Sequence, residues 1–154
     1  MKGMAMIGVT RSEVTEWLES YYDAWRRSDP GAASSLFTAD AIYSESPYEQ
    51  SWPEGKRMTG RQQIAEYWRY VTIDLSRFID GGFDLWAVEG EKAFARWWTD
   101  AEILGEGYWV DAQGILRLTF VDRLDGQLVC SELLEWNPAI PESHHHRETH
   151  QTDQ

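Results

Sequence analysis

The spacing of apolar residues changes at Gly81-Gly82 from a helical repeat to a strand-like alternation. Beyond this point the alternation predicts four strands, at 83–89, 93–103, 108–122 (with a possible break near Gly114) and 128–136. Turn-forming residues at 89–92 and 124–126 join neighbouring strands closely enough for hairpins. The second half of the chain is therefore expected to form an antiparallel sheet.

Before Gly81 the first predicted element is a helix from about Arg11 to Ser28. Thr10 and Glu13 form a T-x-x-E capping box, in which each side chain accepts a hydrogen bond from a free amide at the helix start. The apolar stripe of this helix consists of Val14, Trp17, Leu18, Tyr21 and Trp25. Because these residues recur every three or four positions, one face of the helix is expected to be buried.

Two further helices and one strand are predicted between Asp29 and Gly81. Asp29-Pro30 is a typical N-cap and first position, and this helix is expected to end near Asp40, with Ala33, Leu36 and Phe37 facing inward. Residues 41–45 are predicted as a strand, followed by a loop over 46–58. Thr59 and Gln62 are expected to cap the third helix, whose stripe contains Ile64, Tyr67, Trp68, Val71 and Leu75.

This order of elements predicts the α+β fold class. Three N-terminal helices would pack on one face of a curved, mostly antiparallel sheet, with a pocket between helices and sheet. We expect residues 1–9 to form a flexible N-terminus, residues 10–138 the folded domain, and residues 139–154 a disordered, histidine-containing tail.

The charge balance argues against several classes of partner. The chain has 154 residues, with 14 Lys and Arg against 26 Asp and Glu, and a formal net charge of -12. Such an acidic chain has no electrostatic attraction for nucleic acid or for anionic membrane surfaces. No stretch of 18 apolar residues is present. We therefore expect no nucleic-acid partner and no membrane partner.

The positions of histidine and cysteine restrict the chemistry. The four histidines all lie in the last eleven residues, at His144, His145, His146 and His150. Unless the tail folds back, the body cannot contain a Ser-His-Asp site, a Cys-His site or a histidine-ligated zinc. The single cysteine, Cys130, cannot form an internal disulfide, which fits a cytoplasmic protein. Catalysis would rely on carboxylates, Tyr, Trp, Arg or backbone amides, and we expect neither metal nor cofactor.

Four segments of the chain resemble the nuclear transport factor 2-like superfamily, in particular its SnoaL-like and ketosteroid-isomerase-like members. The segments are YYDAWRRSDPGAASSLFTADAIYSESP, GRQQIAEYW, ARWWTD and LVCSELLEW, within residues 14–137. The resemblance implies a cone-shaped α+β fold with a pocket and dimerisation through the open face of the sheet. The superfamily includes isomerases, cyclases, hydrolases, dehydratases and non-catalytic binding domains, so the fold alone does not give the activity.

The resemblance also implies roles for two residues. Isomerases of this superfamily carry a tyrosine oxyanion donor eight residues before the Asp that opens the second helix, which corresponds to Tyr21 here. Their carboxylate base lies eight residues after the Phe that ends this helix, which corresponds to Glu45. Leu118 stands near the position of their second donor, a protonated Asp, so the two-donor site of a steroid isomerase is incomplete here.

Each of these two residues also has a structural interpretation. Burial would suit Glu45 to abstract a proton next to a carbonyl, whereas an exposed Glu45 would only pair with a nearby Arg57 or Arg61. Tyr21 would either stabilise a developing oxyanion or be a core tyrosine on the helix stripe.

The nine tryptophans exceed what packing alone requires in a domain of this size. The proposed ligand-binding set is Trp25, Tyr43, Tyr48, Trp52, Trp68, Trp97, Leu118, Glu132 and Trp136. Adjacent Trp97 and Trp98 point to opposite faces of a strand, so one is expected to face the pocket or core and the other a homodimer contact. Glu132 is the candidate second carboxylate of the pocket, and a metal site made of Glu45, Asp100 and Glu132 is a weaker alternative without supporting spacing.

The sequence is compatible with three functional interpretations. The first is a cofactor-free enzyme that transfers a proton on a small apolar or aromatic carbonyl compound, as isomerases and cyclases of the superfamily do. The alternative is a non-catalytic module that binds a small hydrophobic ligand or a protein. The third is an assembly role, in which the aromatic residues only fill the core and a dimer interface.

Overall fold

The computed structural model describes residues 8–136 and 143–146, and its first helix, α1 (Arg11–Arg26), begins as predicted at the capping box. The Thr10 hydroxyl accepts a hydrogen bond from the Glu13 amide at 3.1 Å, and the Thr10 amide donates to the Glu13 carboxylate at 3.0 Å. Just before the cap, the Val9 amide donates to the Gly90 carbonyl at 2.8 Å, so this part of the expected flexible N-terminus is anchored to the turn at Gly90.

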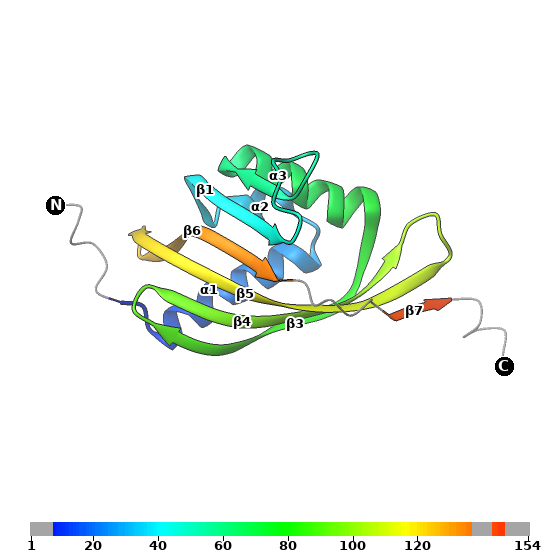
Figure 1. Cartoon of the computed structure of the whole chain (residues 1–154). Coiled ribbons are helices and arrows are strands. Elements are labelled where there is room, and N and C mark those ends of the chain that lie inside the picture. The colour runs from blue at the N-terminus through cyan, green and yellow to red at the C-terminus, as the bar shows by residue number, and fades with distance from the viewer. Residues whose placement is uncertain (1–7, 137–142, 147–154) are drawn as a thin grey trace.

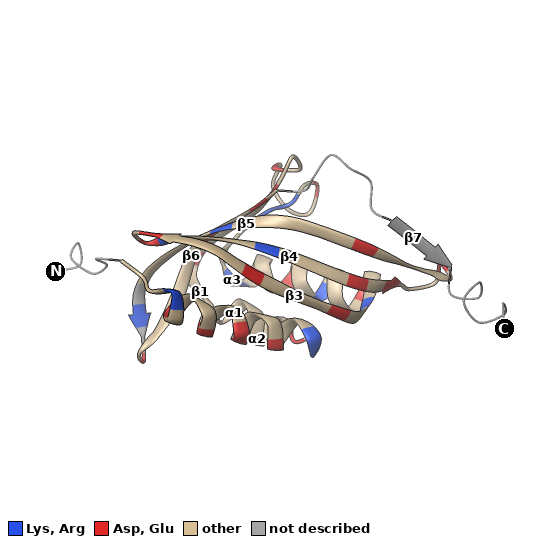
Figure 2. Ribbon diagram, turned by 90° about the horizontal axis from the view of Figure 1, so that it is seen from below, with Lys and Arg blue, Asp and Glu red and all other residues tan. Residues whose placement is uncertain are grey.

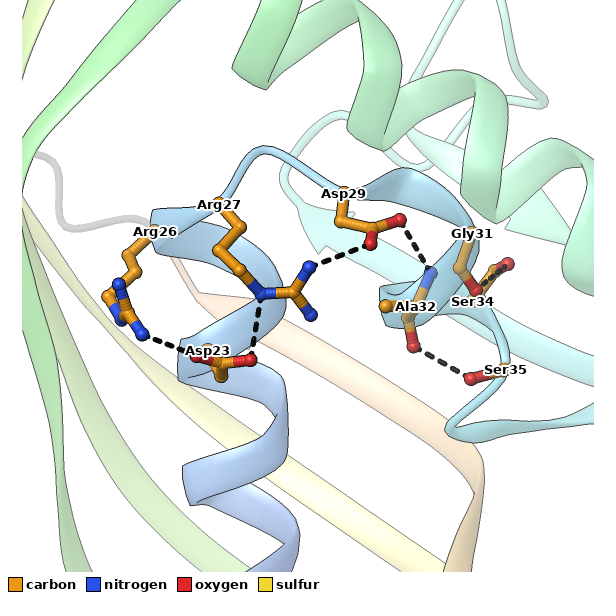
Figure 3. A network of polar contacts seen from close by, with 8 residues as sticks. All are labelled: Asp23, Arg26, Arg27, Asp29, Gly31, Ala32, Ser34 and Ser35. Atoms are coloured by element: carbon orange, nitrogen blue, oxygen red, sulfur yellow. Dashed lines mark hydrogen bonds and ion pairs between the residues drawn. The ribbon is translucent and has the colours of Figure 1, made fainter.

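Polar contacts set the sharp turn from α1 into α2 (Pro30–Ser34). Arg27 forms ion pairs with Asp23 at 2.8 Å and with Asp29 at 3.0 Å (Figure 3). Asp29 caps α2, since its carboxylate accepts a hydrogen bond from the Ala32 amide. Pro30 and Asp29 thus have the predicted roles, and the turn directs the chain back across the sheet.

The prediction that this second helix extends to near Asp40 is wrong. The helix ends at Ser34, and Phe37 already belongs to strand β1 (Phe37–Ser46), where it pairs with Cys130. The Leu36 carbonyl accepts a hydrogen bond from the Cys130 amide. Long-range strand pairing therefore overrides the local helical pattern of the apolar side chains.

The sheet has the strand order β2-β1-β6-β5-β4-β3, with β7 paired to β5. The remaining strands are β2 (Arg57–Thr59), β3 (Ser76–Glu89), β4 (Lys92–Ile103), β5 (Tyr108–Leu124), β6 (Gln127–Trp136) and β7 (Ser143–His146). Only β1 and β6 pair in parallel within this sheet, and all other pairings between these strands are antiparallel. The predicted α+β class and mostly antiparallel sheet are confirmed.

Several strand boundaries differ from the prediction. Gly81 and Gly82 lie inside β3, where a side chain at either position would come within 2.9 Å of Trp98 atoms. β5 continues through Gly114 without a break. β2 and β7 were not predicted; β7 lies within the expected disordered tail, and 137–142 and 147–154 lie outside the described residues.

The third helix, α3 (Gly60–Arg69), follows β2 and continues into the π-helical segment η2 (Tyr70–Leu75). Its predicted cap is wrong in both side chains: Thr59 is the N-cap residue but its side chain makes no capping hydrogen bond, and Gln63 rather than Gln62 accepts the hydrogen bond of the Thr59 amide. Ile64, Tyr67 and Trp68 are buried as predicted, whereas Leu75 is 37% exposed. α3 packs on β1 and α2, so its buried face looks toward the end of β1.

α1 crosses the sheet and contacts β3 and β6, while α3 packs on β1 and η2 contacts β3 (Figure 1). Figure 2 shows acidic residues along α1, where Glu16 and Glu19 are exposed. The core between these layers includes Trp17, Phe37 and Phe120, whose rings meet edge to face. No helix in the described part of the chain combines the length and apolarity required to cross a membrane.

We predict that Thr10→Ala lowers the free energy of unfolding by about 1 kcal/mol, because the substitution removes the N-cap of α1. Thr15→Ala is the matched control, since Thr15 is exposed within the same helix and alanine has a higher helix propensity there. Urea unfolding of the two variants measures the difference. Equal stabilities of the two variants would contradict a stabilising role for the capping box.

Candidate functional site

A cavity of about 250 Å³ lies between the helices and the sheet. Six of the residues proposed from the sequence line it: Tyr21, Trp25, Tyr43, Glu45, Trp68 and Trp97. They come from α1, β1, α3 and β4, so the cavity is formed where these four elements meet. Its volume is just below the range of about 300–1,000 Å³ that is typical of ligand pockets. A ligand enclosed here would be small.

Glu45 lies near the end of β1 and is only 5% exposed. The Tyr67 hydroxyl donates a hydrogen bond of 2.8 Å to Glu45 Oε1, and Lys56 Nζ lies 3.5 Å from the same atom. Both contacts hold the side chain of Glu45 in place at the wall of the cavity. The partner of Glu45 is therefore Lys56 of the following loop, rather than Arg57 or Arg61.

Glu135 is a second carboxyl group in the cavity, and it was not proposed from the sequence. It is buried on β6 and lies directly beside Glu45, because β1 and β6 pair in parallel with these two residues in register. Burial, followed by the charge of Glu45, raises the pKa of Glu135 to about 8, against smaller opposing effects of Tyr43 and Lys56. At neutral pH Glu135 therefore retains its proton.

Tyrosine hydroxyls surround the two carboxyl groups. The Tyr43 hydroxyl donates a hydrogen bond of 3.1 Å to Glu135 Oε1. Tyr21 is buried on α1 with its ring 5.1 Å from that of Trp68, and burial followed by the charge of Glu135 raises the pKa of Tyr21 well above its usual value. Burial likewise raises the pKa of Tyr43 and Tyr67. All three tyrosines remain neutral hydrogen-bond donors over the range of pH in which proteins are stable.

Trp97 forms part of the sheet wall beside Glu135, and Gly114 on β5 makes room for its indole ring. A Cβ atom at residue 114 would lie 2.5 Å from Trp97 Nε1. The indole N–H is near enough to favour ionised Glu135, but it has no hydrogen-bond partner among the described residues. The prediction for this pair of tryptophans holds in that Trp97 lines the cavity and Trp98 does not.

Five residues proposed as ligand contacts are outside the cavity lining, and those assignments are wrong. Tyr48 is 51% exposed, and Lys56 Nζ lies 5.2 Å from its ring centre. Trp52 packs its ring against Tyr67 on the outer side of α3 and donates its N–H to Glu66. The loop after β1 thus keeps Tyr48 and Trp52 outside the cavity lining, although its Lys56 is part of that lining.

The other three corrections concern the sheet. Leu118 is fully buried in the core, farther along β5 than the cavity reaches. Glu132 pairs with Arg117 at 3.6 Å on the opposite face of the sheet, so it cannot form a carboxylate cluster with Glu45. Trp136 is on that face too, because it follows inward-facing Glu135 by one residue, and it is 39% exposed.

Sequence reasoning missed Glu135, Tyr67 and Lys56. The alternation of β6 contained a signal for Glu135, since it shares the parity of buried Leu133, whereas Glu132 does not. Tyr67 was recognised as part of the buried stripe of α3 but not as a partner of Glu45. In the described part of the chain, no three His, Cys, Asp or Glu residues are grouped closely enough to hold a metal ion.

The profile of the SnoaL-like domain matches residues 18–130. No curated protein matches the chain significantly. Among solved structures, a ketosteroid isomerase-like protein from Erwinia carotovora atroseptica is similar, with a TM-score of 0.66 and 15% identity over 84% of this chain and 96% of that chain.

Two further solved structures are similar. A proposed scytalone dehydratase from Novosphingobium aromaticivorans has a TM-score of 0.62 and 16% identity, over 88% of this chain and 87% of that chain. A type 2 hexachlorocyclohexane dehydrochlorinase has a TM-score of 0.62 and 11% identity, over 87% of each chain. At these identities the likeness shows a common fold.

We predict that Glu135 lowers stability as the pH rises. Its pKa of about 8 in the folded chain exceeds the ordinary 4.5, so the folded state holds an extra proton between these values. The free energy of unfolding should therefore fall by at most about 1.4 kcal/mol per pH unit from about pH 5 to pH 8. Glu135→Gln should flatten this slope in urea unfolding series.

Glu132→Gln is the matched control, because it makes the same substitution on the same strand but on the opposite face. This control should retain the wild-type slope. If Glu135→Gln and Glu132→Gln show the same pH dependence, Glu135 does not take up the extra proton.

Proposed function

The chain belongs to the SnoaL-like domain family, and from this premise we propose that it is a cofactor-free enzyme that moves a proton on a small apolar or aromatic carbonyl compound. One observation carries the proposal. Two buried carboxyl groups, Glu45 and Glu135, lie side by side in one aromatic cavity, and burial beside Glu45 raises the pKa of Glu135 to about 8. Paired titratable groups with separated pKa values are typical of acid–base sites.

In the proposed reaction Glu45 is the general base. Its carboxylate removes a proton from the carbon next to the carbonyl group, and the electrons of the broken C–H bond form an enolate. Glu45 then returns the proton to another carbon of a conjugated enolate, which shifts a double bond. Alternatively, its acid proton exchanges with solvent, and a solvent-derived hydrogen is returned to the same carbon. Lys56 and Tyr67 hold the carboxylate in place before the transfer. A positioned base contributes about 10²–10⁴-fold to such a step.

Glu135 is the proposed donor to the carbonyl oxygen. Because its pKa is raised to about 8, it is protonated at neutral pH and can donate a hydrogen bond to the developing oxyanion. Tyr21, which lines the same cavity, is the second proposed donor. Glu135 would thus replace the protonated Asp of the steroid isomerases, whose position near Leu118 is apolar in this chain.

We predict that Glu45→Gln lowers the rate of hydrogen exchange at the benzylic carbon of 1-phenyl-2-propanone in D₂O by at least about 100-fold. The amide cannot accept the proton, yet it preserves the shape of the side chain, so binding should change little. NMR follows the loss of the benzylic proton signal, and quenching of tryptophan fluorescence follows binding.

Glu132→Gln is the control, and it should exchange the probe at the wild-type rate. Wild-type exchange by Glu45→Gln would exclude Glu45 as the base. Binding of the probe without exchange above the buffer rate in the wild-type protein would identify the alternative, a non-catalytic binding module.

We also propose that the protein forms a homodimer through the outer face of the sheet. Ile115 and Trp136 are cross-strand neighbours on this face, and they are 37% and 39% exposed. Such an apolar pair suits the centre of an interface between copies. Homodimerisation through this face is also what the family resemblance implies.

Trp136→Ser is therefore predicted to convert a dimer into a monomer, measured by light scattering after size exclusion. Trp86→Ser is the control, since Trp86 is 54% exposed but lies on the edge strand β3. A monomeric wild-type protein, or an equal effect of both substitutions, would contradict the proposed interface.

A further inference from the structure

The cavity has a polar end and an apolar end. Glu45, Glu135 and the hydroxyls of Tyr43 and Tyr67 are at the end where β1 and β6 terminate. The opposite end is lined by apolar side chains, including Val71, Leu75, Phe78, Ile103 and Val110. A ligand that fills the cavity therefore meets hydrogen-bonding groups at one end only.

The register of the sheet gives the distance between the polar end and the apolar end of the cavity. Leu116 on β5 pairs with Glu135, and the lining continues along the same strand to Val110, six residues away. At about 3.3 Å per residue, the lining extends about 20 Å along the strand. β6 ends at Trp136, whereas β4 and β5 continue well past that point (Figure 1). A volume of about 250 Å³ drawn out over this length is a narrow channel.

The side-chain hydroxyl groups in the apolar part of the cavity already donate hydrogen bonds to backbone carbonyl groups. Thr72 donates its hydroxyl proton to the Trp68 carbonyl at 2.7 Å, and Ser76 donates to the Val71 carbonyl at 2.6 Å. Thr99 donates to the Asp80 carbonyl at 3.0 Å. These three hydroxyl groups therefore have no proton left to offer a ligand, and this part of the wall favours hydrocarbon.

The apolar end is also open to solvent. Leu75 is 37% exposed, and Val71, Phe78 and Ile103 are half-buried, whereas Glu45 and Glu135 are buried. A ligand would thus enter with its polar group first and leave its apolar part in the channel. Lys56 is the one cation among the described lining residues, and it already pairs with Glu45. An anionic head group would face the charge of Glu45 without a free counter-ion.

We propose that the substrate is an uncharged carbonyl compound with a single polar head and a narrow, unbranched apolar tail that lies along β4 and β5. The proposal rests on the proposed function, since it takes the carbonyl group to be the head that reaches Glu45 and Glu135. Leu75 and Ile103 are the residues that select for tail length. The proposal excludes compact polyhydroxylated ligands and ligands with a charged head.

The test is calorimetric titration of the wild-type protein with 2-butanone, 2-hexanone, 2-octanone and 2-decanone. Affinity should rise with each added methylene, by up to about fourfold, the fold-change that corresponds to about 0.8 kcal/mol per buried methylene. Decanoate should bind at least tenfold more weakly than 2-decanone. An affinity that stays constant beyond 2-hexanone overturns the predicted tail, and tighter binding of decanoate overturns the uncharged head.

Variants at the open end locate the tail. Leu75→Ser and Ile103→Ser should each weaken 2-decanone at least threefold and leave 2-butanone unchanged. The matched controls are Ile73→Ser and Leu104→Ser, which lie two residues and one residue away, are exposed and are outside the lining. Equal effects of lining and control substitutions on 2-decanone would overturn the placement of the tail, and urea unfolding shows that each variant is folded.

Failure of this inference and failure of the proposed function give different results. Exchange of 1-phenyl-2-propanone together with constant affinities for the ketones leaves the function intact and overturns the substrate class. A rising affinity series without exchange in the wild-type protein supports the substrate class and contradicts catalysis.

Discussion

The parallel pairing of β1 with β6 is the interaction on which the candidate site depends. This pairing places Glu45 directly beside Glu135, in strands that are about 4.8 Å apart. Two buried carboxyl groups at this distance cannot both ionise without a large cost in free energy. Of the two carboxyl groups, Glu45 accepts the hydrogen bond of Tyr67 and lies nearer to Lys56, whereas burial beside Glu45 raises the pKa of Glu135, which retains its proton. The proposed roles of base and proton donor therefore follow from the position of Lys56, which pairs with Glu45.

The unequal lengths of the strands determine the shape of the cavity. β1 and β6 end beside the carboxyl pair, while β4 and β5 continue and provide a floor of alternating apolar residues beneath η2. Gly114 is needed in this floor, because a side chain there would displace the Trp97 indole from the wall beside Glu135. A single sheet thus supplies both the acid–base end and the apolar channel.

The sequence predicted most of the fold because capping and periodicity are local. The capping box of Thr10 and Glu13, the N-cap at Asp29 and the alternation of the late strands all act over a few residues. It also identified Glu45 and Tyr21 as lining residues through a family resemblance. The partners of Glu45 could not be predicted, because they depend on the register of β1 with β6 and on the path of the loop after β1. Phe37 illustrates the same limit, since its pairing with Cys130 ends a helix that local spacing would extend.

Two of the errors in the site assignments, at Glu132 and Trp136, have a common origin in the two faces of the sheet. Glu132 and Glu135 are three residues apart and therefore point to opposite faces, which makes one a partner of Arg117 and the other a group of the cavity. Burial then gives chemically identical side chains different properties: the solvent-facing carboxylate forms an ion pair, and the enclosed one retains a proton near neutral pH. Since no histidine is among the described residues that line the cavity, a carboxyl group shifted in this way is the group best suited to donate a proton there at neutral pH. The cavity has a candidate acid as well as a candidate base because the side chain of Glu135 lies on the cavity face of β6.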